Sequence, residues 1–113
     1  MEKHDLGRTS LGMDANLAAL LSYLFWFISG FIIYVLEKEN KFVRFHAMQS
    51  ILSFGFLFGF GVIVSFIPFI GVLMVPVCWV ISTMLWIILM FKAYNGEYFK
   101  LPVIGDIAQK NAS

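Results

Sequence analysis

The sequence predicts an all-α integral membrane protein, built as a bundle of three transmembrane helices. Hydrophobic residues make up 60% of its 113 residues and charged residues only 13%, whereas a water-soluble domain typically has about 45–50% and about 25%. No Asp, Glu, Lys or Arg occurs in residues 15–36 or in residues 45–91, runs of 22 and 47 residues. A helix that crosses a bilayer needs about 20 apolar residues. The first run therefore fits one crossing and the second run fits two.

Proline and the edges of the uncharged runs divide the chain into segments. Pro68 removes a backbone hydrogen-bond donor and obstructs the preceding turn, so a helix should end just before it. A re-entrant hairpin is the alternative for residues 45–91, but each half is long enough to cross, and we prefer two crossings. The predicted segments are a polar tail at 1–14, a first transmembrane helix at 15–36, a polar loop at 37–46, a second transmembrane helix at 47–67, a short turn at 68–72, a third transmembrane helix at 73–91 and an interfacial, polar tail at 92–113.

Lysine and arginine are unevenly distributed between the two sides of this three-helix topology. The amino-terminal tail contains Lys3 and Arg8. The side with the polar loop and the carboxyl-terminal tail contains six such residues, namely Lys38, Lys41, Arg44, Lys92, Lys100 and Lys110. Positive charge is retained preferentially in the cytoplasm. We therefore expect a multi-pass protein of the cell membrane, with its amino terminus outside and its carboxyl terminus in the cytoplasm.

Composition and motifs argue against several classes of function. A net charge of +1 argues against a nucleic-acid partner, because phosphate recognition needs clustered Lys and Arg. Cys78 is the single cysteine, which excludes a disulfide within the chain and a multi-cysteine metal site. No predicted span has an ionisable residue near its centre, and no serine nucleophile motif with paired His and Asp is present. We expect no catalytic residue, no cofactor and no metal site, and hence not an enzyme.

A polar face is predicted at the start of the second transmembrane helix. If that helix begins near Arg44, then His46, Gln49, Ser50 and Ser53 lie within about 100° of one another around it. Unpaired hydrogen-bonding groups are costly at membrane depth, so this face should point at another helix or into a wet cavity. For His46, a structural hydrogen bond is favoured over proton handling or metal binding. A face that contacts only its own chain would argue against a pore.

Gly55 and Gly59 form a GxxxG pair on the opposite side of the same helix. Small residues at this spacing let two helix backbones approach closely. Two uses are open, packing within the monomer and self-association of several copies. Phenylalanine alternates with other residues over 54–60, but a lone strand cannot satisfy its backbone in lipid, so the segment is interpreted as helix.

Three segments together resemble a known family. They are GMDANLAALLSY at residues 12–23, EKENKFVRFHAMQS at residues 37–50 and KAYNGEYFKLP at residues 92–102. The chain is similar to a family of small, uncharacterised prokaryotic integral membrane proteins, which is grouped with the Tic-twenty component of the chloroplast inner-envelope import machinery. The resemblance implies a membrane location and a helical fold. It implies no activity, because the family has none established and the import component is described with four helices.

The residues that are distinctive of that family fall on the polar loop and the tail, on one membrane side in the predicted topology. We expect them to form a shared cytoplasmic interaction patch, in which Arg44 could pair with Glu97. The patch consists of Glu37, Asn40, Phe42, Arg44, Phe45, His46, Gln49, Ser50, Asn95, Gly96, Glu97 and Tyr98. The plainer interpretation of residues 37–46 is a solvated connector with anchoring cations.

These features predict a non-enzymatic accessory or scaffold subunit. Its partners would be the lipid bilayer and other membrane proteins or further copies of itself, bound through helix–helix contacts at Gly55 and Gly59 and through the cytoplasmic patch. The alternative is an oligomeric pore or a protein-translocation subunit that resembles the chloroplast import component. In that case the polar faces of several copies would surround a path.

Overall fold

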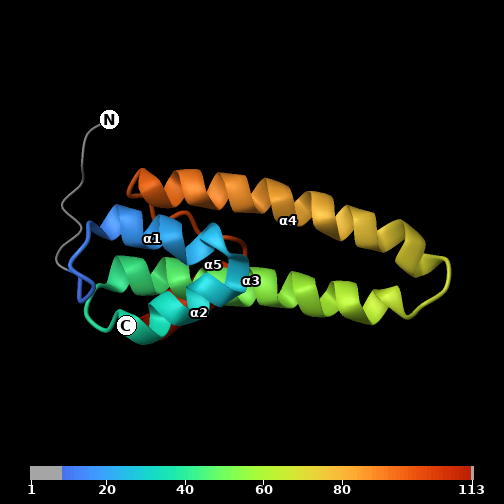
Figure 1. Ribbon diagram of the computed structural model, residues 1–113, viewed down its shortest axis with the longest axis horizontal. Coiled ribbons are helices and arrows are strands. Elements are labelled where there is room, and N and C mark those ends of the chain that lie inside the picture. Colours follow the sequence, from blue (N-terminus) through green and yellow to red (C-terminus); the bar gives the residue numbers. More distant parts are fainter. Residues whose placement is uncertain (1–8, 113) are drawn as a thin grey trace.

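The computed structural model describes residues 9–112, and each regular element in that range is a helix. The helices are α1 (Ala15–Leu24), α2 (Trp26–Leu36), α3 (Lys41–Ser65), α4 (Ile70–Tyr94) and α5 (Ile104–Ala112). α3 and α4 lie antiparallel along the long axis of the molecule, and α1, α2 and α5 gather at the end where α3 begins and α4 finishes (Figure 1). The all-α prediction is confirmed. Residues 1–8 of the predicted polar tail, with Lys3 and Arg8, lie outside the described residues.

α3 and α4 have the length and composition of membrane spans. Each contains 25 residues, which is about 37 Å at about 1.5 Å per residue. Their most apolar windows have mean hydropathies of 1.9 and 2.4. The prediction of three transmembrane helices is wrong, because two helices of the described chain are long and apolar enough to cross a membrane.

Residues 15–36 form a helical hairpin in place of the predicted first transmembrane helix. α1 and α2 contain 10 and 11 residues, or about 15–17 Å each, whereas the hydrocarbon core is about 30 Å thick. Trp26 has a φ of 57°, in the left-handed region, and α2 runs back from it toward the end where α1 starts (Figure 1). In a membrane this segment would enter and leave on one side. It is residues 15–36 that turn back, and not residues 45–91, for which a re-entrant hairpin was considered.

Serine hydroxyl groups satisfy backbone atoms at the break between α1 and α2. The Ser29 hydroxyl accepts from the Phe25 N–H at 2.9 Å and donates to the Ser22 carbonyl at 3.1 Å. The Ser50 hydroxyl of α3 donates to the Trp26 carbonyl at 2.7 Å. Backbone groups without a helical partner must find another partner where water is scarce. These hydroxyls supply such partners, so the break is a supported feature of the fold.

α2 packs very closely against α3 at Gly30. A Cβ atom on Gly30 would lie 2.8 Å from the Cβ of Ser50 and 2.9 Å from the carbonyl oxygen of Ala47. Both distances are shorter than van der Waals contact, so a larger residue would push the helices apart. The same close approach brings the Ser50 hydroxyl within bonding distance of Trp26.

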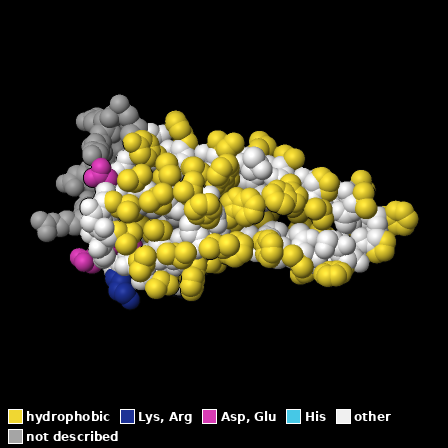
Figure 2. Space-filling model, viewed as in Figure 1, with side chains coloured by type: hydrophobic (Ala, Val, Ile, Leu, Met, Phe, Trp, Pro, Cys, Tyr) yellow, Lys and Arg dark blue, Asp and Glu magenta, His cyan; other side chains and the backbone are white. Residues whose placement is uncertain are grey.

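The charged side chains of the described chain lie toward one end of the molecule. In Figure 2 the visible acidic and basic groups gather at that end, and the rest of that face is hydrophobic or uncharged. Between residues 9 and 112, charges occur before α1, around the start of α3, and from the last turn of α4 onwards. The turn between α3 and α4 carries none, and its Phe69 is 84% exposed. The charges of the described chain therefore lie at the end opposite the α3–α4 turn.

The segments that flank the helices share this charged end. The Ser10 N–H donates to the Glu37 carboxylate at 2.8 Å, and the Asn16 side-chain amide donates to the Tyr94 carbonyl at 3.0 Å. The expectation that the two terminal segments lie on opposite sides depended on three crossings. In the structure, the segment before α1 and the segment after α4 lie at the same end of the molecule.

α5 folds the carboxyl-terminal tail back onto the start of α3. Its Ala108 and Ala112 are buried against Phe45, Met48 and Leu52. Small alanine side chains allow the short helix to lie close to α3. The predicted interfacial tail is therefore docked on the bundle.

Candidate functional site

A chain of hydrogen-bonded polar side chains fills the interior at the charged end. Gln49 Nε2 donates to the Tyr23 hydroxyl at 3.1 Å, the Tyr23 oxygen lies 2.7 Å from His46 Nδ1, and His46 Nε2 lies 2.8 Å from the Glu97 carbonyl oxygen. A carbonyl oxygen can only accept, so we assign the proton to Nε2, and Nδ1 accepts from the tyrosine. The three side chains are fully buried. This is the structural hydrogen bond expected for His46.

Gln49 fastens the carboxyl-terminal tail to α3. Its Nε2 also donates to the Phe99 carbonyl at 2.8 Å, and its Oε1 accepts from the Leu101 N–H at 3.0 Å. Buried backbone groups outside regular structure need partners. The polar face of α3 supplies them to the tail segment that follows α4, with His46 bound to Glu97 in the same way.

Aromatic rings surround His46 and close the network. The ring centroids of Phe42 and Phe45 lie 4.6 Å and 5.0 Å from that of His46, and Tyr98 lies 4.9 Å from Phe42 and 5.2 Å from Phe45. Burial raises the pKa of Tyr98 above its ordinary value of 10.0, so the ring stays neutral. Excluding water strengthens the enclosed hydrogen bonds.

Glu37 is a buried carboxylate that binds backbone N–H groups from two segments. It accepts from Ser10 at 2.8 Å and 2.9 Å, from Leu11 at 3.4 Å, from Glu39 at 3.1 Å and from Asn40 at 2.9 Å. Burial alone raises the pKa of Glu37, but these hydrogen bonds outweigh it and hold the pKa below the ordinary value of 4.5. The carboxylate ties the segment before α1 to the loop before α3.

We expect Glu37→Gln to lower the free energy of unfolding by about 2 kcal/mol at neutral pH, because an amide accepts fewer bonds and turns an NH₂ group toward donors. In the wild type the carboxylate contributes fully above the unfolded pKa near 4.5, and its contribution is lost as the pH falls through the lower folded pKa. Unfolding in detergent at neutral and acidic pH measures this. The control is Glu39→Gln, whose exposed carboxylate accepts from the Ser10 hydroxyl at 3.3 Å. Equal losses in the two variants would contradict the prediction.

Arg44 binds the end of α2 and not the tail. Its Nη1 donates to the carbonyls of Glu37 at 2.7 Å and Tyr34 at 3.1 Å, and its guanidinium lies 4.0 Å from the Tyr34 ring centroid. Glu97 instead lies 3.5 Å from Lys92 Nζ. The predicted Arg44–Glu97 pair is wrong, because Arg44 satisfies carbonyls that a helix leaves free at its carboxyl end.

The structure brings the predicted patch residues together, but most of them face the interior. The buried members are Glu37, Asn40, Phe42, Phe45, His46, Gln49 and Ser50. Arg44, Asn95 and Gly96 are half-buried, and Glu97 and Tyr98 are exposed. The part that remains open to a partner is an edge at residues 95–98. The other members form a joint between α1, α3 and the tail.

Gly55 and Gly59 lie on a part of α3 that is open. A Cβ atom at either position would have nothing within 4 Å. Their neighbours Phe56 and Ile63 are each 65% exposed. Of the two uses considered for this glycine pair, packing within the monomer does not occur among residues 9–112.

Residues of the first uncharged run complete these contacts, and sequence reasoning missed their roles. Tyr23 joins His46 to Gln49, and Ser29 supports the break between α1 and α2. The polar side chains within this apolar run were the signal, because a hydrogen-bonding side chain there usually faces protein and not lipid. The indole N–H of Trp86 adds a bond to the Tyr23 carbonyl at 2.8 Å.

Comparison with known proteins gives the family. The model of the MamF/MmsF family, described as a magnetosome magnetite crystal formation protein family, matches residues 8–108. The match includes the helical hairpin, both spans and the joint around Gln49. The chain belongs to this family.

Relatives of this family member occur in archaea. A UPF0132 membrane protein of Methanocaldococcus jannaschii is 51% identical over 105 residues, which is 93% of this chain and 94% of the relative. A UPF0132 membrane protein of Archaeoglobus fulgidus is 45% identical over 98 residues, 87% of this chain and 95% of the relative. Their names state a membrane protein and no activity, so the prediction of a small prokaryotic membrane protein is confirmed. The grouping with the chloroplast import component stays a prediction. No solved structure matches this chain.

Proposed function

We propose that this protein is a non-enzymatic accessory or scaffold subunit, which binds a partner helix within the membrane on the face of α3 that contains Gly55 and Gly59. The observation that carries the proposal is the open space beside both glycines, where a Cβ atom would have nothing within 4 Å. Helices associate in lipid largely by close packing of small residues. Glycine also weakens a helix by about 1 kcal/mol relative to alanine. Two glycines that no other part of their own chain approaches therefore favour a contact with another chain.

The partner in this proposal is another membrane protein or a further copy of the chain. The exposed edge at residues 95–98 lies at the charged end and offers a second, polar contact. The charged end faces the cytoplasm, because six Lys and Arg residues of the described chain lie there and the turn between α3 and α4 has none. The segment before α1 is then cytoplasmic as well, which revises the expectation of an outside amino terminus.

A pore or translocation subunit, the alternative function, would need a free polar face. His46, Gln49 and Ser50 bond to their own chain, at Glu97, at the tail and at Trp26. In residues 9–112, no buried side-chain nitrogen or oxygen lacks a hydrogen-bond partner. With that face engaged, several copies would have little polar surface with which to line a path, so we favour the accessory role.

The magnetite in the family's description is not part of the proposal. In the part of the chain that the structure describes, no group of three or more His, Cys, Asp or Glu side chains could hold a metal ion. The glycine face of α3 and the polar edge at residues 95–98 are surfaces that suit protein or lipid.

Replacing both Gly55 and Gly59 with isoleucine tests the proposal. We expect the complex extracted from native membranes to fall to a monomer in native mass spectrometry, because the added side chains would occupy the space that a partner helix needs. The fold should survive, since a Cβ atom at either position has nothing within 4 Å. The matched control is Gly61→Leu, which alters a glycine on another face of α3. A complex that persists in the double variant, or a wild type that is already monomeric, would refute the proposal.

A further inference from the structure

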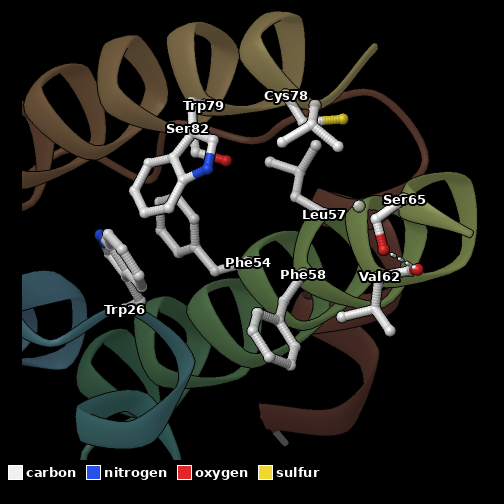
Figure 3. Close-up of a pocket in the computed structure, with 11 residues that line it drawn as sticks. Trp26, Phe54, Leu57, Phe58, Val62, Ser65, Cys78, Trp79 and Ser82 are labelled. Carbon is white, nitrogen blue, oxygen red and sulfur yellow. Dashed lines mark hydrogen bonds between the residues drawn. The ribbon is translucent and has the colours of Figure 1, made fainter. Parts of the chain in front are cut away.

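A cavity of about 250 Å³ lies between α3 and α4, next to the tip of the α1–α2 hairpin. Phe54 and Phe58 of α3 line one side, Trp79 and Ser82 of α4 line the other, and Trp26 stands at one end (Figure 3). Ser82 is the middle residue of α4, about 18 Å from each end of the helix. The cavity therefore lies near the centre of the hydrocarbon core in the proposed topology.

Four aromatic rings line this cavity, those of Trp26, Phe54, Phe58 and Trp79. The rings of Trp26 and Trp79 meet edge to face, with centroids 5.6 Å apart and planes at 67°. Aromatic walls favour flat rings, which pack against them in stacked or edge-to-face geometry. An apolar cavity of about 150 Å³ holds one benzene ring. A space of about 250 Å³ therefore suits two fused rings.

Among the described serines and threonines, Ser82 is the one whose hydroxyl group makes no hydrogen bond. The other described serines and threonines all bond; for example, Ser65, also at the cavity, donates to Val62 at 2.6 Å, and Thr83 donates to Trp79 at 2.9 Å. Serine in a helix usually donates to the carbonyl four residues back. An unpaired hydroxyl at the centre of a bilayer is costly, so an acceptor oxygen on a bound molecule would complete this site.

We propose that the cavity binds a flat bicyclic ring that carries carbonyl oxygens, the chemistry of a membrane naphthoquinone head group, with one carbonyl accepting from Ser82. The aromatic walls hold the ring, and the hydroxyl fixes its orientation. A phospholipid acyl chain presents no acceptor at this depth, because its ester oxygens stay near the bilayer surface. Binding is independent of the partner face, since Gly55 and Gly59 do not line the cavity.

The test uses menadione, a naphthoquinone without a tail, added to the full chain in nanodiscs of quinone-free lipid. We expect saturable quenching of tryptophan fluorescence, because Trp26 and Trp79 form part of the cavity wall. Ser82→Ala should weaken the affinity about fivefold, the typical effect of losing one hydrogen bond. Its unfolding temperature should stay unchanged, because the hydroxyl makes no bond in the folded chain.

Two further variants separate this site from general partitioning into lipid. Gly61→Leu should abolish the saturable part, because residue 61 lines the cavity and a Cβ there meets nothing within 4 Å. Thr83→Val, at an exposed position outside the cavity and away from the glycine face, should bind as the wild type does. Quenching that never saturates, or equal affinity in the wild type and Ser82→Ala, would overturn the proposal. Lipid with brominated acyl chains provides the last test, since it quenches the fluorescence of tryptophans that it contacts. If it quenches the tryptophans of this chain and added menadione does not relieve the quenching, the cavity holds lipid and the proposal is overturned.

Discussion

Replacing Gln49 with leucine should release the carboxyl-terminal tail from α3 and lower the free energy of unfolding by about 3 kcal/mol. The Gln49 amide bonds to the Tyr23 hydroxyl, the Phe99 carbonyl and the Leu101 N–H. Leucine has a similar size, so the packing would change little. The three partners, however, would lose their bonds in an interior that water does not reach, and an unpaired buried group costs about 1–3 kcal/mol.

Two measurements separate this effect from a general loss of stability. The unfolding temperature in detergent should fall, and limited proteolysis should cut the tail at Lys100 sooner than in the wild type. The control is Thr83→Val, which also removes a bonded polar group from a spanning helix. Its hydroxyl is exposed and bonds only within its own helix, to Trp79, so the change should be small. A Gln49→Leu variant with the stability and protease resistance of the wild type would contradict the role of Gln49 as the joint.

Cysteine labelling in intact cells should separate the two ends of the molecule completely. In a Cys78→Ser background, an impermeant thiol reagent should modify Phe69→Cys and should leave Ser10→Cys and Lys38→Cys unmodified until the cells are broken. The reason is topological. Ser10 binds Glu37 next to Lys38, and Phe69 lies in the uncharged turn at the opposite end. All three positions are exposed, so access depends on the membrane alone.

The other labelling patterns have distinct meanings. If positions 10 and 69 react together and position 38 does not, residues 15–36 cross the membrane, and the re-entrant hairpin is refuted. If positions 10 and 38 react from outside and position 69 does not, the hairpin stands and the cytoplasmic assignment of the charged end is reversed. A cysteine on the far side that reacts after lysis is the control for accessibility.

The helices α3 and α4 could be predicted from the sequence because the features that define them are local. Pro68 interrupts the 47-residue uncharged run, and α3 ends at Ser65 while α4 begins at Ile70. The helical period also placed His46 and Gln49 on one polar face. Length, charge and the missing donor of proline act along the chain, so they can be read from it.

The break in residues 15–36 could not be found in that way. The run has the length and composition of a span, and neither proline nor glycine stands at Phe25 or Trp26. Ser29 supports the break from within the run, but the contact with α3 that also holds it comes from elsewhere in the chain. The Ser50 hydroxyl binds the Trp26 carbonyl, and Gly30 allows α2 to approach α3. Composition does not distinguish a crossing helix from two half-length helices with bonded ends.

The sequence by itself determined that this is a helical membrane protein, the approximate positions of α3 and α4 among its three predicted spans, and that the start of α3 needs polar partners. The tertiary structure decided which groups those partners are. They are the tail at residues 97–101, about 50 positions away from Gln49, and Tyr23 in the α1–α2 hairpin. The physical reason is that a polar side chain in an apolar helix can be recognised from the local sequence, whereas its hydrogen-bond partner depends on how the whole chain packs.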